Sequence, residues 1–140
     1  MRSPWRSVQP LEADREYVAL VTDIPPQRLS STGRWFRGAS EVKAQLPETD
    51  GVVGYTLAAS PLRKQYRTLS VWTDEEAMAT FARSGAHGRL VRELSGEMGH
   101  TRFVRWTFAG RAGRPRWRDA MRRLESEPTA SHPKHRSNER

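Results

Sequence analysis

Residues 65–73 carry the side chains best suited to bind a ligand. The side chains at every second position of this segment are Tyr66, Thr68, Ser70 and Trp72. Alternate residues of a β-strand point to the same face of a sheet, so these four would lie side by side. Two hydroxyls between two aromatic rings can hydrogen-bond to a planar ligand and stack on it. We therefore predict the floor of a substrate-binding pocket. The alternative is an amphipathic strand that packs against helices, with Trp72 in the core.

Two residues further along the chain could handle protons and charge. The imidazole of His87 can act as an acid or a base near neutral pH, and the guanidinium of Arg92 can hold an anionic or phenolate oxygen. We predict both as catalytic residues. The alternatives are that His87 is a helix cap or packing residue, and that Arg92 is an exposed arginine paired with Glu93 or Glu97. Because no His, Asp or Glu stands at ligand spacing from His87, we predict no metal site.

The composition excludes several other kinds of site. The chain has 140 residues and no cysteine, which excludes disulfides, thiolate nucleophiles, zinc ribbons and iron–sulfur clusters. Its apolar runs are all shorter than the roughly 18 residues of a membrane span. Residues 1–10 carry two arginines but no apolar stretch behind them, so they do not resemble a signal peptide. We expect a cytoplasmic protein without membrane association.

The positive charge is concentrated near the C-terminus. The net charge is +8; residues 1–110 contain 15 Lys and Arg against 12 Asp and Glu, and residues 111–140 contain 9 against 4. The arginines of residues 111–123 surround one aromatic residue, Trp117, and could touch phosphates. The segment has no recognised motif for reading bases, so we expect nucleic-acid binding to be unlikely. A helix anchored by Trp117 that covers a partner subunit is the more economical interpretation.

The pocket residues must be positioned by the surrounding elements. Hydropathy patterns predict strands at residues 16–23, 51–59, 65–73 and 100–108. They predict helices at residues 27–46 and 74–98, the second weakened at Ser84-Gly85 and capped by Thr73 with Glu76. The order β-α-β-β-α-β is that of the ferredoxin-like fold. We predict an α+β fold with a four-stranded antiparallel sheet.

The segments outside this pattern give the domain organisation. We predict an N-terminal arm at residues 1–15 and the folded domain at residues 16–110. A linker and a short amphipathic helix follow at residues 111–125, and a disordered basic tail at residues 126–140.

The sheet face away from the helices is predicted to be apolar. Leu69 and Val71 point to that face, and residues 16–23 are apolar on both faces. Because an exposed apolar sheet of this size would aggregate, something must cover it. A second copy that packs sheet against sheet is the simplest cover, so we predict a homodimer.

Several of these segments resemble a known family. Gly51-Val-Val-Gly-Tyr55, the run from Leu69 through Trp72 to Ala77, and Phe81 into Ser84-Gly-Ala-His87 are similar to the dimeric α/β-barrel superfamily, and within it to the antibiotic biosynthesis monooxygenase group. The resemblance implies a homodimeric barrel with one pocket per subunit between sheet and helices. The family includes cofactor-independent oxygenases of polycyclic phenols and haem-degrading enzymes.

The residues of this chain match the functional residues of the family at some positions only. In the quinone-forming monooxygenases a pocket tryptophan matches Trp72, and an arginine matches Arg92 or Arg89. Thr68 stands where those enzymes have asparagine, and Met78 where they have tyrosine. The histidine of the haem degraders falls on Val91 instead of His87. The resemblance therefore implies no cofactor, with haem as a remote alternative.

Together these observations predict a monooxygenase-like enzyme for a hydrophobic aromatic or polyketide-like small molecule. Met78, and Trp35 with Phe36 and Trp106, are candidate pocket walls, although core packing explains the last three equally well. The alternatives are a cyclase or isomerase that uses the same pocket, and a non-catalytic ligand-binding or stress-associated dimer.

Overall fold

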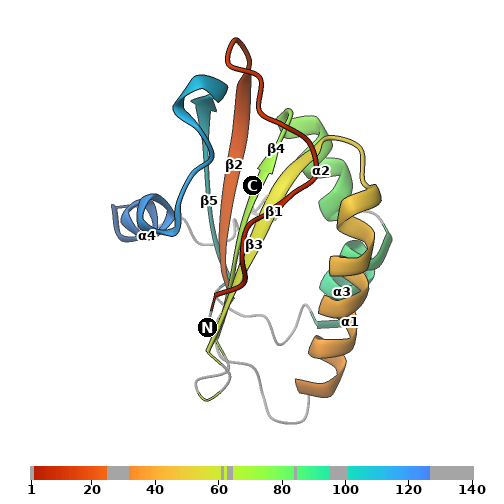
Figure 1. The fold of residues 1–140 in the computed structure, drawn as a ribbon. Helices are drawn as coiled ribbons and strands as arrows, with labels where there is room; N and C mark the ends of the chain where they lie inside the picture. The colour runs from red at the N-terminus through yellow and green to blue at the C-terminus, as the bar shows by residue number, and fades with distance from the viewer. Residues whose placement is uncertain are drawn as a thin grey trace, which may run out of the picture.

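The computed structural model of the chain describes residues 2–24, 32–60, 62, 65–83, 85–94 and 101–126 (Figure 1). The long strands are β2 (Glu16–Ile24), β3 (Val52–Ser60), β4 (Gln65–Trp72) and β5 (Arg102–Ala109). The helices between them are α1 (Thr32–Gln45), α2 (Glu75–Arg83) and α3 (Gly85–Leu94). The order of strands and helices is the predicted β-α-β-β-α-β, and the α+β class is confirmed.

The sheet is antiparallel and has the order β1-β3-β4-β2-β5. The two central strands are β4 and β2, which pair from Val18 opposite Trp72 to Ile24 opposite Tyr66. The fifth strand, β1 (Arg6–Ser7), comes from the segment predicted as an arm and lies beside β3 at one edge. The predicted four strands are therefore present, and the N-terminal arm adds a short edge strand to them.

The predicted long helix is divided into α2 and α3. The division falls at the predicted weak point, where Gly85 adopts the left-handed region with φ of +56°. That conformation suits glycine and ends the first helix. The predicted cap is displaced by one residue: the Ala77 backbone N–H donates to Asp74 Oδ1 at 2.7 Å, so Asp74 and not Thr73 is the cap. Thr73 instead continues the sheet, because its N–H donates to the Gly51 carbonyl at 2.8 Å.

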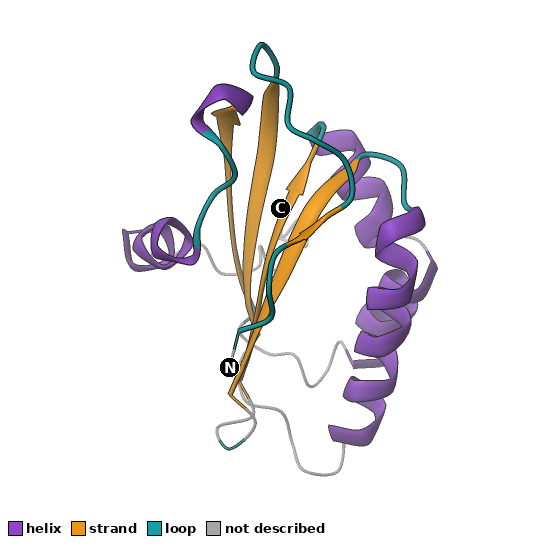
Figure 2. Ribbon diagram, in the orientation of Figure 1, coloured by secondary structure: helices purple, strands orange, loops and turns teal. Residues whose placement is uncertain are grey.

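Helices α1, α2 and α3 cover one face of the sheet (Figure 2). A cluster of buried side chains fills the space between these two layers; its members are Val18, Leu46, Val52, Tyr55, Trp72, Met78 and Phe81. A second cluster further along the same face contains Ile24, Tyr66 and Leu90. The helices approach closely there, since a Cβ on Gly38 of α1 would collide with Leu90 of α3. This packing fixes the helices above the predicted pocket strand.

The opposite face of the sheet is covered by α4 (Trp117–Ser126) (Figure 1). The helix lies within one residue of the end of the segment 111–125, where the sequence predicted a short helix. Its apolar stripe includes Ala120 and Leu124, which lie in one buried cluster with Val21, Leu69 and Val104 of the sheet. Arg102 of β5 donates to the Leu124 backbone carbonyl and so satisfies one of the terminal carbonyls of the helix.

The N-terminal arm covers the rest of this face. Trp5 and Leu11 pack against a buried cluster of sheet residues, which are Tyr17, Ala19, Val53 and Val71. The Trp5 ring lies directly on Gly54, where any Cβ would collide with it. A glycine is required at this position by that close approach.

The predicted reason for a homodimer is therefore wrong. Leu69 and Val71 are fully buried within one chain, because α4 and the N-terminal arm already cover the apolar face. The prediction that the C-terminal helix covers a partner is corrected in the same way: α4 packs on its own sheet. The homodimer stays the prediction from the sequence, and the covered apolar face gives the opposing prediction of a monomer. The mass of the chain in solution decides between them. The predicted disordered tail falls, from residue 127 onward, outside the described residues.

Candidate ligand-binding site

The four predicted pocket residues of β4 do share the face that the helices cover. Trp72 lies in the cluster with Met78 and Phe81, and Tyr66 lies in the cluster with Leu90. Three of the four, Tyr66, Ser70 and Trp72, are buried. Thr68 is only half-buried, although it lies in the middle of a central strand.

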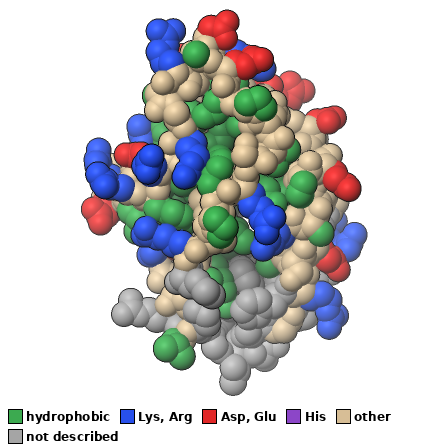
Figure 3. Space-filling model, in the orientation of Figure 1, with side chains coloured by type: hydrophobic (Ala, Val, Ile, Leu, Met, Phe, Trp, Pro, Cys, Tyr) green, Lys and Arg blue, Asp and Glu red, His purple; other side chains and the backbone are tan. Residues whose placement is uncertain are grey.

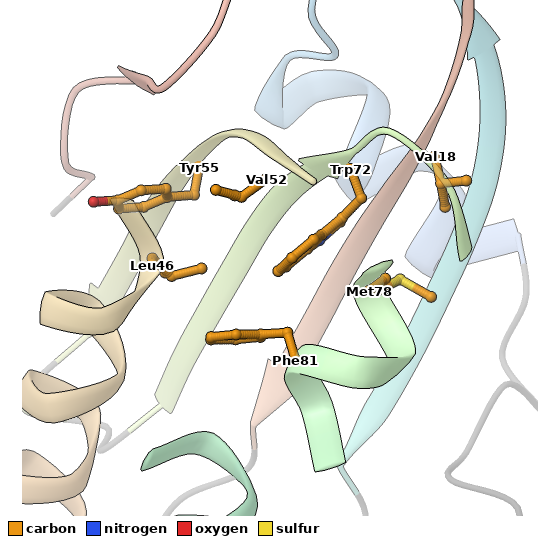
Figure 4. Close-up of a cluster of buried hydrophobic side chains, with 7 residues drawn as sticks. All are labelled: Val18, Leu46, Val52, Tyr55, Trp72, Met78 and Phe81. Carbon is orange, nitrogen blue, oxygen red and sulfur yellow. The ribbon is translucent and has the colours of Figure 1, made fainter. Parts of the chain in front are cut away.

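Trp72 is built into the core (Figure 4). Its side chain is 2% exposed, and its indole Nε1–H donates to Ser70 Oγ at 2.9 Å. The indole ring packs on Phe81 of α2 with 5.2 Å between ring centroids. The polar atoms of Trp72 and Ser70 therefore satisfy each other, which a buried indole N–H requires. Trp72 and Ser70 can form the back wall of a pocket, but their polar atoms bind each other and do not point to a ligand.

Thr68 is less buried than the other three residues of this row. Its register partners are Thr22 on β2 and Leu57 on β3. Leu57, and Leu20 on β2, are also only half-buried, whereas Trp72 and Tyr66 at the two sides of this region are buried. In the part of the chain that the structure describes, the Thr68 hydroxyl makes no side-chain hydrogen bond. The middle of the helix-covered face thus offers a hydroxyl that a ligand could meet.

His87, at the start of α3, extends the row of rings that begins at Trp72. Its imidazole lies 5.3 Å from the Phe81 ring, centroid to centroid. His87 Nδ1 lies 2.9 Å from the Ala82 carbonyl oxygen, which can only accept, so Nδ1 carries the proton and Nε2 is free to accept one. Burial lowers the pKa of His87 below its ordinary value, and the bond to Ala82 opposes this in part. A neutral imidazole with a free Nε2 can act as a base.

Arg92 lies away from this row. The side chain is exposed, and its guanidinium reaches back along α3 toward Gly88. Arg92 is therefore at the surface of the helix layer and does not approach Thr68 or Trp72 from within it. Arg89, the alternative candidate, is exposed and forms an ion pair with Glu41 of α1 at 3.2 Å.

The remaining predicted residues lie in different surroundings. Met78 is buried beside Trp72, as a pocket wall or a core residue would be. Burial raises the pKa of Tyr66, so its hydroxyl stays protonated. Trp35 and Phe36 lie in α1, but their side chains are outside the described part of the chain. Trp106 is not a wall of this pocket, because it points to the opposite face and packs against the cluster of α4.

Two kinds of feature are absent from the residues that the structure describes. Among them, no three His, Asp or Glu side chains lie close enough together to hold a metal ion. No described helix is long and apolar enough to cross a membrane.

Sequence reasoning missed a hollow on the opposite face. It has a volume of about 430 Å³ and lies between the end of β5 and α4. Its lining includes Trp106, Phe108, Arg114, Arg122 and Arg123. The alternation of β5 could have placed Trp106 and Phe108 on one face, but only the folded chain brings the arginines of α4 beside them.

Comparisons with known proteins show a shared fold. No protein-family model matches the sequence, and no curated protein is significantly similar to it. An antibiotic biosynthesis monooxygenase has a similar structure, with a TM-score of 0.56, 11% identity, and coverage of 64% of this chain and 95% of that one. A candidate monooxygenase from Fusobacterium nucleatum has a TM-score of 0.62 and 8% sequence identity. The match covers 72% of this chain but only 46% of that longer protein.

A conserved protein from Methanosarcina mazei gives a TM-score of 0.55 with 13% identity, and the match covers 64% of this chain and 90% of that one. At these identities the likeness concerns the α+β fold alone. It agrees with the fold expected from the sequence resemblance.

Proposed function

We propose that this chain binds a planar aromatic or polyketide-like small molecule between the helices and the sheet, and oxygenates it without a cofactor. The observation that carries the proposal is the half-buried Thr68 hydroxyl in the middle of the helix-covered face. A few polar groups among apolar side chains are typical of a small-molecule site. The fold shared with an antibiotic biosynthesis monooxygenase supports the same reading.

The row Trp72, Phe81 and His87 supplies the apolar surface and the base. Phe81 contacts both of the other rings, so the three form one continuous row of rings. A phenol bound against it can give its proton to Nε2 of His87, the nitrogen left free by the bond to Ala82. Thr68 would hydrogen-bond to an oxygen of the substrate and fix its orientation.

The reaction needs only the substrate and molecular oxygen. Loss of the phenolic proton makes the ring electron-rich enough to pass electrons directly to O₂. At a ring CH₂ position, one oxygen atom becomes the new carbonyl, and the two hydrogens leave with the other oxygen as water. The substrate supplies all four electrons, so the balance requires no other reductant.

Two alternatives use the same pocket. A cyclase or isomerase would need the proton transfer at His87 but no oxygen, and a non-catalytic binder would need neither. The departures at Thr68 and Met78 from the residues of the quinone-forming enzymes leave both alternatives open.

Oxygen uptake tests the proposal. Purified chain is mixed with a panel of polycyclic phenols that carry a ring CH₂, and oxygen consumption and quinone absorbance are followed together. We expect turnover above the spontaneous rate and a fall in kcat of about 100-fold or more in His87→Gln. The matched control is Arg83→Gln, which changes an exposed residue on the neighbouring helix α2.

The outcomes separate the three functions. Binding of the phenols without oxygen uptake or any other product would overturn the oxygenase and leave a binding protein. An isomerised product without oxygen uptake would identify the isomerase. Absence of binding across the panel would reject the pocket itself.

A further inference from the structure

The outer surface of the C-terminal segment is strongly basic. Residues 111–126 contain six arginines, all of them exposed, against the two acids Asp119 and Glu125. Figure 3 shows Lys and Arg side chains gathered at the left of the molecule, where α4 lies in Figure 1. This surface lies on the side of the sheet opposite the proposed pocket, so the proposed function does not use it.

Aromatic rings hold three arginines of this surface in place. They are Arg123 over Trp106 at 4.5 Å, Arg114 over Trp5 at 5.1 Å and Arg2 over Trp117 at 5.7 Å, each measured from the guanidinium carbon to the ring centroid. A guanidinium over a ring loses little of its hydrogen-bonding capacity, because its N–H groups lie in its own plane. Such arginines are ordered in advance and can still bind an anion.

Two neighbouring hollows connect these arginines. The hollow of about 430 Å³ is lined by Trp106, Phe108 and Arg123, and a second of about 450 Å³ by Arg2, Arg118 and Met121. Arg122 of α4 lines both hollows. The basic surface therefore extends over both hollows, as a track that is longer than a site for one anionic group.

The nearby acids do not neutralise the track. Asp119 lines the first hollow, where one carboxylate oxygen accepts the Arg116 backbone N–H at 3.2 Å. Glu125 lines the second. In the described part of the chain, Arg118 and Arg122 form no ion pair with either acid.

We propose that the surface formed by α4, the end of β5 and the N-terminal arm binds single-stranded nucleic acid. Phosphates lie along the arginines of α4, and a base stacks on the partly exposed ring of Phe108 in the first hollow. A track with several separated cations matches the regular charges of a phosphodiester chain. Aromatic rings beside such a track favour a single strand, whose bases are free to stack.

This inference departs from the expectation drawn from the sequence. The arginines of residues 111–123 carry no base-reading motif, and we therefore expect binding without sequence preference. The structural basis is the gathering of arginines from two ends of the chain beside aromatic rings on one face.

Fluorescence anisotropy with the full-length chain tests the proposal. The probes are a labelled oligothymidylate of about 20 nucleotides and a duplex of the same length, each at about 50 and 200 mM salt. We expect a micromolar or tighter Kd for the single strand at the lower salt, weaker binding of the duplex, and quenching of tryptophan fluorescence by the single strand.

Charge reversal on α4 locates the site. Arg118→Glu combined with Arg122→Glu should weaken binding of the single strand at least tenfold and lower the slope of log K against log salt by about 1.4. Arg37→Glu with Arg83→Glu is the matched control, because both arginines are exposed on the helix layer and the net charge changes equally. The control should change the Kd less than about threefold, since remote charges are screened. Circular dichroism checks that each variant is folded, and the paired Arg→Gln variant replaces the Glu variant if α4 is lost.

Three results would overturn the proposal. They are a Kd above about 100 μM for the parent chain, an equal loss of affinity in the control variant, and duplex binding as tight as that of the single strand. None of these results bears on oxygen uptake or phenol binding, so the proposed function is tested separately.

Discussion

The guanidinium of Arg123 lies 4.5 Å from the centroid of the Trp106 ring and joins α4 to the edge strand β5. This contact shows on which side of the sheet the C-terminal helix lies. It also shows that Trp106 faces away from the proposed pocket. The sheet therefore has one face that the helices cover, where we propose the pocket, and another that α4 and the N-terminal arm cover.

Leu124→Ala tests how strongly α4 is held. Leu124 is 3% exposed in a cluster with Leu69 and Val21 of the central strands. Truncating a buried leucine removes apolar contact and leaves a cavity, so we expect the free energy of unfolding to fall by about 2–5 kcal/mol. Urea denaturation measures this change. The exposed neighbour Glu125→Ala should change it by less than about 0.5 kcal/mol, and equal effects would contradict the packing of α4 on the sheet.

Assembly depends on the same helix. A dimer that pairs sheet against sheet would have to displace α4 and the N-terminal arm, which bury Leu69 and Val71. We therefore expect the full-length chain to scatter light as a species of 16.0 kDa. A chain that ends at Gly110 should self-associate, because its apolar face is uncovered. A chain that ends at Ser126 is the control and should behave as the full-length chain does.

A stable dimer of the full-length chain would have a different meaning. It would show that copies pair through another surface, or that α4 leaves the sheet when they pair. Either result would restore the homodimer predicted from the sequence and reject the self-covered monomer.

Trp72→Phe tests whether Trp72 lines a ligand pocket or only packs in the core. The change leaves a void beside Phe81, and we expect a loss of about 1–3 kcal/mol in unfolding free energy whether or not Trp72 lines a pocket. Ser70→Ala should have a similar effect, because it leaves the buried Trp72 N–H without its acceptor. Binding is the deciding measurement. Aromatic ligands should quench the fluorescence of the parent chain, and Trp72→Phe should lose that response while Ser70→Ala keeps it.

Thr68→Val tests the polar part of the site. The substitution keeps the shape of the side chain and removes its hydroxyl. If that hydroxyl meets the ligand, affinity for phenols should fall by about 0.5–1.5 kcal/mol, which is a change in Kd of about 2- to 12-fold, in isothermal titration. Thr107→Val at an exposed position of β5 is the control. Unchanged affinity in Thr68→Val would move the pocket elsewhere on the fold.

The ionisation of His87 gives a pH dependence. Burial holds its pKa in the folded chain below the ordinary value of 6.5. The unfolded chain therefore takes up the proton at a higher pH than the folded chain does. The stability associated with a neutral His87 is complete above pH 6.5 and falls as the pH drops below that value.

His87→Gln should remove this dependence. We expect the parent to lose more free energy of unfolding than the variant between about pH 7.5 and about pH 5, measured by urea denaturation at each pH. Equal losses in the two proteins would show that His87 ionises alike in the folded and unfolded chains.

Local pattern was sufficient to predict the four long strands and the helices of this protein, but not the short edge strand β1. The alternation of residues 65–73 predicted β4 and the shared face of Tyr66 and Trp72, and the Ser84-Gly85 pair predicted the division between α2 and α3. These features depend on residues that are neighbours in the chain, where periodicity and glycine geometry act directly. The order of the elements then led to the α+β fold.

Only the tertiary structure decided what each apolar surface contacts. The sequence showed that Leu69 and Val71 needed cover and that a short amphipathic helix anchored by Trp117 follows within residues 111–125. It assigned these two surfaces to different copies of the chain. The structure brings them together in one chain and places Trp106 with them. The hydrophobic effect has no direction, so an apolar pattern reveals that a surface will be buried and leaves its partner to the path of the folded chain.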